Sequence, residues 1–221
     1  MGQRHFSIIR ESFADTGTLR MTVGEGDARR VGFTRMDAGT AEDYALLDEL
    51  AVPYIAGTGE RVLAYLERLR GGLGGYRVDR YEHSLQTASR ALRAGECEEL
   101  VVAALLHDIG DDLAPENHSE LGAALLRPYV ARHTHWLVLH HGLFQGYHYF
   151  DKIGLDPNAR DRHLGHPAFE ATVRFCADYD QTSFDPDYDT LPIDRFVPLV
   201  ERVFRRKPWG PRTERDRPAP D

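Results

Sequence analysis

The sequence predicts an all-α fold, and three observations support this prediction. Between residues 39 and 207, apolar residues recur every three or four positions, which is the spacing of one helix face. No segment alternates apolar and polar residues for long enough to indicate a strand. The run from Leu100 to Leu106 is apolar on all sides, which is typical of a helix in the middle of a domain. We therefore expect a compact helical bundle.

Length and composition favour one domain with tails. The chain has 221 residues, of which 42% are hydrophobic, enough for one well-packed core. Residues 1–38 mix Gly, Thr, Arg and Asp without periodicity, so we expect a loosely ordered leader. Residues 208–221 are rich in proline and charge and predict a disordered tail. The helical domain is expected to cover residues 39–207.

Charge and hydropathy exclude several classes of protein. The formal net charge is −8, and no lysine or arginine cluster indicates a nucleic-acid groove. No apolar run approaches the roughly 20 residues that a membrane span needs. The two cysteines, Cys97 and Cys176, lie far apart in apolar, helix-like stretches, so a disulfide scaffold is not expected. We expect a cytoplasmic protein without nucleic-acid or membrane partners.

The first four helices are predicted from caps and apolar stripes. Thr40 and Asp43 resemble a capping box at the start of AEDYALLDEL. The second helix, ERVLAYLERLR, carries one apolar stripe and stops at Gly71-Gly72. The third contains YEHSLQTASRALRA and ends near Gly95. The fourth, CEELVVAALLHDIG, is the fully apolar one, and a histidine and an aspartate stand at its end.

Four more helices follow. We expect the fifth to begin near His118, the sixth to cover residues 133–143, the seventh to cover residues 167–180 and the last to contain IDRFVPLVERVF. The connection over residues 143–166 is long and aromatic, and connections of this length are often lids or binding loops. Its segment GLFQGYHYFDK could line a pocket for a polar substrate, or it could be a packed surface loop. The polar and aromatic residues in question are Gln145, Tyr147, His148, Tyr149 and Lys152.

His107 and Asp108 are the most informative pair in the chain. A buried apolar helix that ends in an imidazole and a carboxylate needs partners for both, because burying them unpaired costs several kcal/mol. A metal ion would remove that cost by taking both groups as ligands. The alternative is that His107 forms a hydrogen bond in the core and Asp108 caps a turn.

Further candidate ligands lie on other predicted helices. His83, His118 and the His140-His141 doublet each belong to a separate helix, and bundles often build metal sites from facing helices. Asp180 continues an apolar stripe on the seventh helix, whereas Asp178 falls on another face, so Asp180 is the inward carboxylate. Periodicity does not choose between His140 and His141. His133, His135, His163 and His166 are expected to face solvent or cap helices.

The order of these residues resembles the HD-domain superfamily of helical metalloenzymes, in the pattern His83, His107-Asp108, Asp180. The blocks EHSLQTA, AALLHDIG, HSELGAALL and LHH are similar to the mixed-valent diiron oxygenases of that superfamily, which include myo-inositol oxygenase and phosphonate-cleaving enzymes. The resemblance covers residues 76–181.

This resemblance implies two metal ions. The first would be held by His83, His107, Asp108 and Asp180, with Asp108 bridging to a second held by His118 and His140. His140 is chosen because the block is most similar with the ligand directly after Leu139. The implied cofactors are two iron ions in the mixed-valent Fe(II)/Fe(III) state, with manganese, magnesium or zinc as alternatives.

Two departures from the relatives concern the substrate. Phosphonate-cleaving relatives place a lysine four residues after the second-iron histidine, and with His140 as that ligand the position here is Phe144. They also carry a glutamate before the first ligand, where Tyr76 is the nearest substitute. A phosphonate is therefore not expected. We expect Asp108, Tyr76 and Lys152 to take part in catalysis.

The predicted function is an iron-dependent oxygenase that uses O2 to oxidise or cleave a small polar organic substrate with a hydroxylated carbon next to the scissile bond. The main alternative is a metal-dependent phosphohydrolase acting on a nucleotide or other phosphate ester, because it would use the same core ligands. A non-catalytic module that retains the metal would not need all six ligand positions to be filled.

Overall fold

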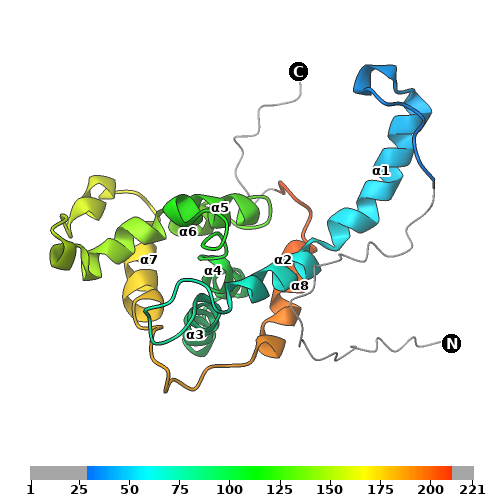
Figure 1. The fold of residues 1–221 in the computed structure, drawn as a ribbon. Coiled ribbons are helices and arrows are strands. Elements are labelled where there is room, and N and C mark those ends of the chain that lie inside the picture. Colours follow the sequence, from blue (N-terminus) through cyan, green and yellow to red (C-terminus); the bar gives the residue numbers. More distant parts are fainter. Residues whose placement is uncertain (1–28, 211–221) are drawn as a thin grey trace. The chain divides into compact units, whose positions relative to one another are not determined.

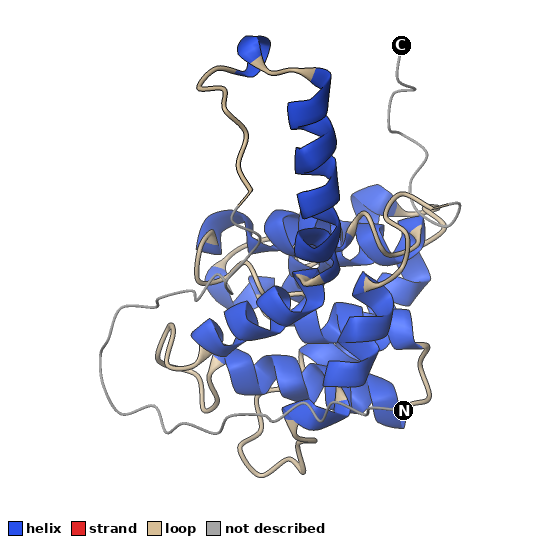
Figure 2. Cartoon of the chain, turned by 90° about the vertical axis from the view of Figure 1, so that its right-hand side faces the viewer, coloured by secondary structure: helices blue, strands red, loops and turns tan. Residues whose placement is uncertain are grey.

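The structure, a computed structural model, describes residues 29–210 (Figure 1). Helices and connecting loops account for this part of the chain, and no strand occurs within residues 29–210 (Figure 2). The prediction of an all-α fold is confirmed. No helix in these residues combines the length and the apolar content of a membrane span. Most of the predicted leader and tail, residues 1–28 and 211–221, lies outside the described residues.

The described residues divide into two compact units, of which the first ends at Ala51 and the second begins at Val52. In the first unit, a short 3-10 helix, η1 (Met36–Ala38), precedes the start of helix α1 (Ala41–Ala56). The amide of Asp43 donates to Oγ1 of Thr40 at 3.2 Å, and the amide of Thr40 donates to Oδ2 of Asp43 at 3.0 Å. These reciprocal bonds confirm the predicted capping box. The helix continues beyond the predicted stretch through Pro53.

The second unit contains the remaining helices. Its longer ones are α2 (Thr58–Leu66), α3 (Arg80–Arg93), α4 (Glu98–Leu106), α5 (His118–Leu126), α6 (Arg132–Gln145), α7 (Phe169–Arg174) and α8 (Val197–Phe204). Short 3-10 helices extend or connect them, namely η2 (Glu67–Leu69), η3 (Pro115–Asn117), η4 (Gly146–His148), η5 (Phe150–Ile153), η6 (Ala159–His163) and η8 (Ile193–Arg195). Each predicted helix therefore has a counterpart, with ends that differ by a few residues.

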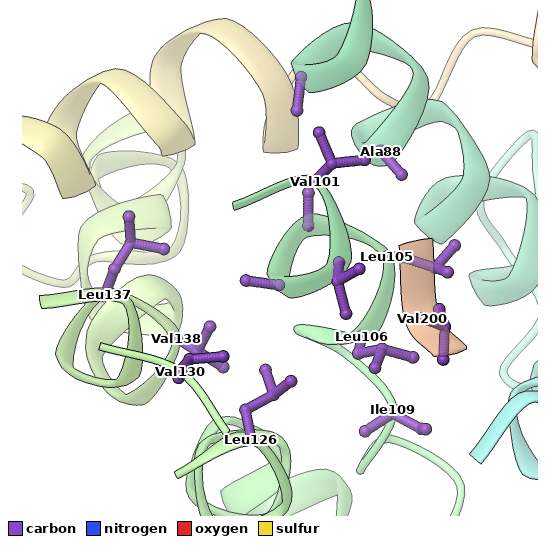
Figure 3. Close-up of a cluster of buried hydrophobic side chains, with 14 of the residues drawn as sticks. Ala88, Val101, Leu105, Leu106, Ile109, Leu126, Val130, Leu137, Val138 and Val200 are labelled. Carbon is purple, nitrogen blue, oxygen red and sulfur yellow. The ribbon is translucent and has the colours of Figure 1, made fainter. Parts of the chain in front are cut away.

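Helix α4 is the centre of the second unit. All its residues from Val101 to Leu106 are fully buried, and the helix packs against α3, α6 and α8. Figure 3 shows this core, with side chains of α4 facing those of the neighbouring helices. Each buried valine or leucine contributes about 1.5–3 kcal/mol relative to an exposed one. The predicted central helix is thus confirmed, and it holds the residues that follow it in a fixed position.

A buried carboxylate fastens the start of α4 to the start of α6. Glu99 accepts hydrogen bonds from the amide of Ala131 and from Oγ1 of Thr134, both at 2.8 Å, and from Nη1 of Arg206 at 2.7 Å. Burial alone would raise the pKa of Glu99. The hydrogen bonds lower the pKa by a larger amount, so it lies below its ordinary value. The bonds from Ala131 and Thr134 join α4 to α6, and the ion pair with Arg206 joins α4 to the segment that follows α8.

The helix that follows α7 has wider turns. Residues Phe175–Asp180 form a π-helix, η7, which packs against α3 and α6. The amide of Gln181 donates to the carbonyl oxygen of Cys176 at 3.0 Å, which is the i to i+5 bond of such a turn. π-helical turns occur frequently at functional sites. Asp180 is its last residue and is buried, whereas Asp178 is exposed, which confirms that Asp180 points inward.

Candidate metal centre

Four histidines and two aspartates meet in the second unit. They come from five segments of the chain: His83 from α3, His107 and Asp108 from the end of α4, His118 from the start of α5, His141 from α6 and Asp180 from η7. All except His118 are buried, and His118 is partly exposed. The structure thus brings together the predicted residues His83, His107, Asp108, His118 and Asp180.

Local features of the sequence position these helices. Oδ1 of Asp79 accepts a hydrogen bond from the amide of Glu82 at 2.8 Å and caps α3 one turn before His83. A Cβ atom on Gly110 would lie 2.6 Å from the carbonyl oxygen of His118, and one on Gly122 would lie 2.7 Å from that of His107. Only glycine permits this close approach, which places α5 directly against the turn that carries His107 and Asp108.

The two carboxylate oxygens of Asp108 face different histidines. Oδ2 lies 3.5 Å from Nε2 of His83 and 3.6 Å from Nε2 of His107. Oδ1 lies 3.3 Å from Nε2 of His118 and 3.1 Å from Nε2 of His141. Asp108 therefore stands between two donor sets.

Asp180 belongs to the first of these sets. Its Oδ1 lies 3.3 Å from Nε2 of His83 and 3.7 Å from Nε2 of His107. The first set is then His83, His107, Asp180 and Oδ2 of Asp108, and the second is His118, His141 and Oδ1 of Asp108. We call these the four-ligand set and the three-ligand set.

The other ring nitrogen of each histidine faces a backbone carbonyl. Nδ1 of His83 lies 2.9 Å from the oxygen of Ser183, and Nδ1 of His107 lies 2.8 Å from that of Ala104. The corresponding distances are 3.1 Å from His118 to Pro115 and 2.7 Å from His141 to Val138. A carbonyl only accepts, so each Nδ1 carries a proton and donates. In the neutral imidazole, Nε2 then presents its lone pair to the cluster, as in metal-bound histidines.

These residues fit metal ions. Nε2 of His83 and Nε2 of His107 are 3.2 Å apart, so two lone pairs would face each other without a cation between them. Ligand atoms about 2.1 Å from one ion are separated by about 3.0–3.4 Å. The separations in the three-ligand set, 3.1 and 3.3 Å, lie in this range, and those in the four-ligand set extend from 3.2 to 3.7 Å. Oδ2 of Asp180 is also buried without a hydrogen-bond partner. A metal ion in each set would satisfy all of these atoms.

The electrostatics of the cluster favour the charged carboxylates. Burial alone raises the pKa of Asp108, but His107, His141 and His83 hold it well below its usual range. Burial likewise raises the pKa of Asp180, and the hydrogen bonds of His107 and His83 lower it more. Both aspartates are therefore carboxylates at neutral pH and can bind cations.

The structure corrects the choice between His140 and His141. The ring of His140 is partly exposed and stacks on Trp136, with centroids 4.1 Å apart, and its Nδ1 lies 3.1 Å from the carbonyl oxygen of Trp136. Trp136 also stacks on His166 at 4.0 Å. His140 thus points away from Asp108, and His141 takes the position that was expected for it. Apolar neighbours on α6 supported both histidines equally, so the rotation of the helix could not be predicted from them.

A cavity of about 380 Å³ opens beside the cluster. It is lined by Tyr76, Arg80, Asp108, His118, His141, Gly142, Gln145, His148, Tyr149, Asp180, Gln181 and Phe184. The ring of Tyr76 stacks on that of Phe184 at 5.0 Å, so the structure places Tyr76 where it can meet a substrate. Its catalytic role stays a prediction. The long connection after α6 contributes His148 and Tyr149 to the cavity wall.

Lys152 does not line this cavity. Its side chain is exposed, and Nζ donates to the carbonyl oxygen of His148 at 2.8 Å and to Oδ1 of Asp151 at 3.4 Å. The expectation that Lys152 reaches the site is therefore corrected. The short helix η5 directs the Lys152 side chain back towards η4.

Arg80 is a site residue that the sequence analysis did not assign. Its Nη1 lies 3.3 Å from Oδ2 of Asp108, and its Nε lies 3.4 Å from Oδ2 of Asp111. Among residues 29–210 it is the one lysine or arginine that lines the cavity. It precedes His83 by three positions, so the helical spacing of α3 could have shown that both share a face. Gln181 and Phe184 follow Asp180 in a turn, where no periodicity indicates their direction.

Comparison with protein families agrees with this geometry. Residues 80–183 match the family model of the HD domain, and this range contains all six residues of the cluster. No curated protein matches the chain. The matched segment and the two groups of buried ligand atoms together show that this chain contains an HD domain with a buried histidine and aspartate metal-binding cluster, as in a metal-dependent enzyme.

Proposed function

We propose that the protein is an oxygenase that holds two iron ions and uses O2 to oxidise or cleave a small hydroxylated organic substrate. The observation that carries this proposal is the division of Asp108 between the two ligand sets. Oδ1 of Asp108 with His118 and His141 makes a set of two histidines and one carboxylate, which is the donor set of many non-haem iron oxygenases. Oδ2 of the same residue reaches the other set, so one carboxylate would bridge both ions.

Iron ions in these sets would supply O2 activation and one-electron oxidation of the substrate. The chain supplies orientation and surroundings. The Nδ1 bonds to backbone carbonyls hold the four imidazole rings in place before any ion binds. Tyr76 and Phe184 form an aromatic wall, and Gln145 donates from Nε2 to Oδ1 of Asp180 at 3.2 Å. The wall limits water, and the amide orients one ligand carboxylate.

The position that receives an anion in phosphonate-cleaving relatives is neutral here. With His141 as the ligand, the residue four positions later is Gln145 rather than Phe144. Gln145 lines the cavity but carries no charge. The absence of a lysine at this position therefore still argues against a phosphonate substrate. Next to Gln145, a substrate with a neutral polar group fits better than an anion.

A phosphohydrolase is the second candidate, and Arg80 is the observation that favours it. Its guanidinium faces the cavity beside Asp108 and could bind a phosphate oxygen. Both candidates would use the same ligands, with manganese, magnesium or zinc in the hydrolase.

Metal identity and coupling separate the two candidates. Protein reconstituted anaerobically with Fe(II) should hold two irons per chain and, after partial oxidation, show the half-integer electron paramagnetic resonance signal of a coupled Fe(II)/Fe(III) pair. His118→Ala is the control, since a single iron cannot give that signal. If magnesium- or zinc-loaded protein turns over phosphate esters and iron-loaded protein gives no coupled signal, the protein is a phosphohydrolase and the oxygenase proposal is wrong.

A further inference from the structure

His148 is a histidine of the cavity wall that lies outside both ligand sets. It ends the short helix η4, which directly follows α6, and it is partly buried. Its Nε2 is fully buried and has no hydrogen-bond partner. A buried ring nitrogen without a partner is costly unless a bound molecule pairs with it. The missing hydrogen-bond partner of Nε2 therefore indicates that His148 contacts the molecule that occupies the cavity.

The other groups in the wall cannot serve as a base. Asp108, Asp180, His118 and His141 belong to the ligand sets, and Arg80 is a permanent cation. The amides of Gln145 and Gln181 do not take up a proton near neutral pH, and the tyrosines of the wall carry phenol groups, a type of group that is a weak base. Burial raises the pKa of Tyr149. Among the residues known to line the cavity, His148 is left as the free base.

The surroundings of His148 keep its ring neutral. Burial lowers its pKa, and the positive charges of Arg160 and Lys152 lower it as well, against an opposing effect of Asp180. The rings of Tyr147 and His148 pack edge to face with centroids 5.4 Å apart, and the guanidinium of Arg160 lies 3.7 Å from the centroid of the Tyr147 ring. These contacts hold the imidazole at the wall in the form that can accept a proton.

We propose that His148 is the general base of this cavity, whose Nε2 takes the proton of a substrate hydroxyl group placed at the metal cluster. The O–H bond breaks, an N–H bond forms at Nε2, and the imidazole becomes an imidazolium. The electron pair stays on the substrate oxygen. This assignment rests on the proposed use of a hydroxylated substrate, but it does not require that the metal be iron. A metal ion held by the cluster would lower the pKa of a hydroxyl group bound to it, and His148 would take the proton.

A proton count during ligand binding tests this assignment without turnover. The probe is acetohydroxamic acid, whose N–OH group loses a proton when it binds a metal ion, and the protein is loaded with zinc. Isothermal titration calorimetry in two buffers of different ionisation enthalpy gives the number of protons released to the solvent. In the wild-type protein the proton should stay on His148, so almost none should be released. In His148→Gln, one more proton per bound probe should appear in the buffer.

The pH dependence of affinity gives a second readout. In His148→Gln the affinity should rise about tenfold per pH unit, because binding releases a proton. The wild-type affinity should change little over the pH range in which His148 is neutral before binding. His133→Gln is the matched control, since His133 is an exposed histidine of α6, and it should behave as the wild type. Circular dichroism would verify that each variant folds.

Equal proton release by the wild type and His148→Gln would overturn the assignment, as would a zinc-loaded wild type that does not bind the probe. The zinc measurement also separates this inference from the proposed function. If the iron-loaded protein gives no coupled electron paramagnetic resonance signal but the zinc-loaded wild type releases almost no protons, the oxygenase proposal fails. His148 would then be the base of a different metal-dependent reaction.

Discussion

Replacing His118 with alanine should remove one metal ion and leave the other. His118 belongs to the three-ligand set, so its loss leaves two protein ligands, one from His141 and one from Asp108. The four-ligand set keeps all its members. The variant should therefore hold one ion where the wild type holds two.

The magnitude follows from the number of ligands. Four-ligand zinc sites bind with about 10–16 kcal/mol, or about 2.5–4 kcal/mol per ligand. The loss of one ligand should then weaken the second ion by about 10²–10³-fold, since 1.4 kcal/mol is tenfold. Equilibrium dialysis followed by elemental analysis measures both affinities, with His133→Ala as the control on an exposed histidine of α6. Two ions bound by His118→Ala with wild-type affinity would refute the division of the cluster into two sets.

Three further predictions concern the packing around the cluster. His141→Ala should lose one metal ion in the same dialysis assay, whereas His140→Ala should keep both, and the reverse outcome would restore His140 as the ligand. Glu99→Gln should lower the free energy of unfolding by about 2 kcal/mol at neutral pH, measured by urea denaturation. The folded pKa of Glu99 is lowered, so its contribution is present above the unfolded pKa of about 4.3 and is lost as the pH falls through the folded value. Wild type and variant should therefore converge in acid, and a constant difference would contradict the role of the charge. Gly122→Ala should cost about 1–3 kcal/mol, because its Cβ would meet the carbonyl oxygen of His107 at 2.7 Å, and it should weaken metal binding measured by dialysis.

The sequence predicted most of the fold because local signals and the apolar pattern agree. Thr40 and Asp43 mark the start of α1, and the apolar run up to Leu106 predicts a central helix with His107 and Asp108 at its end. These are short-range features, and the structure preserves them. Separate helices then needed only to pack around α4 for their histidines to meet.

The errors concern side chains whose direction depends on tertiary packing. His140 and His141 lie next to each other on α6, and the stack of His140 on Trp136 is one contact that separates them. Lys152 follows a chain of short 3-10 helices, and the direction of its side chain has no periodic signal. Neither choice could be made from spacing. His141 is selected by its contact with Asp108, which is distant in the sequence, and Lys152 lies in irregular backbone where its nearest partners are local.

The π-helix has a consequence for how this domain can change. Each turn of a π-helix holds more residues than a turn of an α-helix, so η7 reaches Asp180 with a rotation that a regular helix of the same length would not have. Substitutions that convert Phe175–Asp180 to a regular α-helix of the same length would change that rotation without disturbing α7. The last side chain would then turn away from His83 and His107, and the four-ligand set would lose a carboxylate. Substitutions that make this segment regular, harmless in most helices, would act here as loss-of-metal mutations.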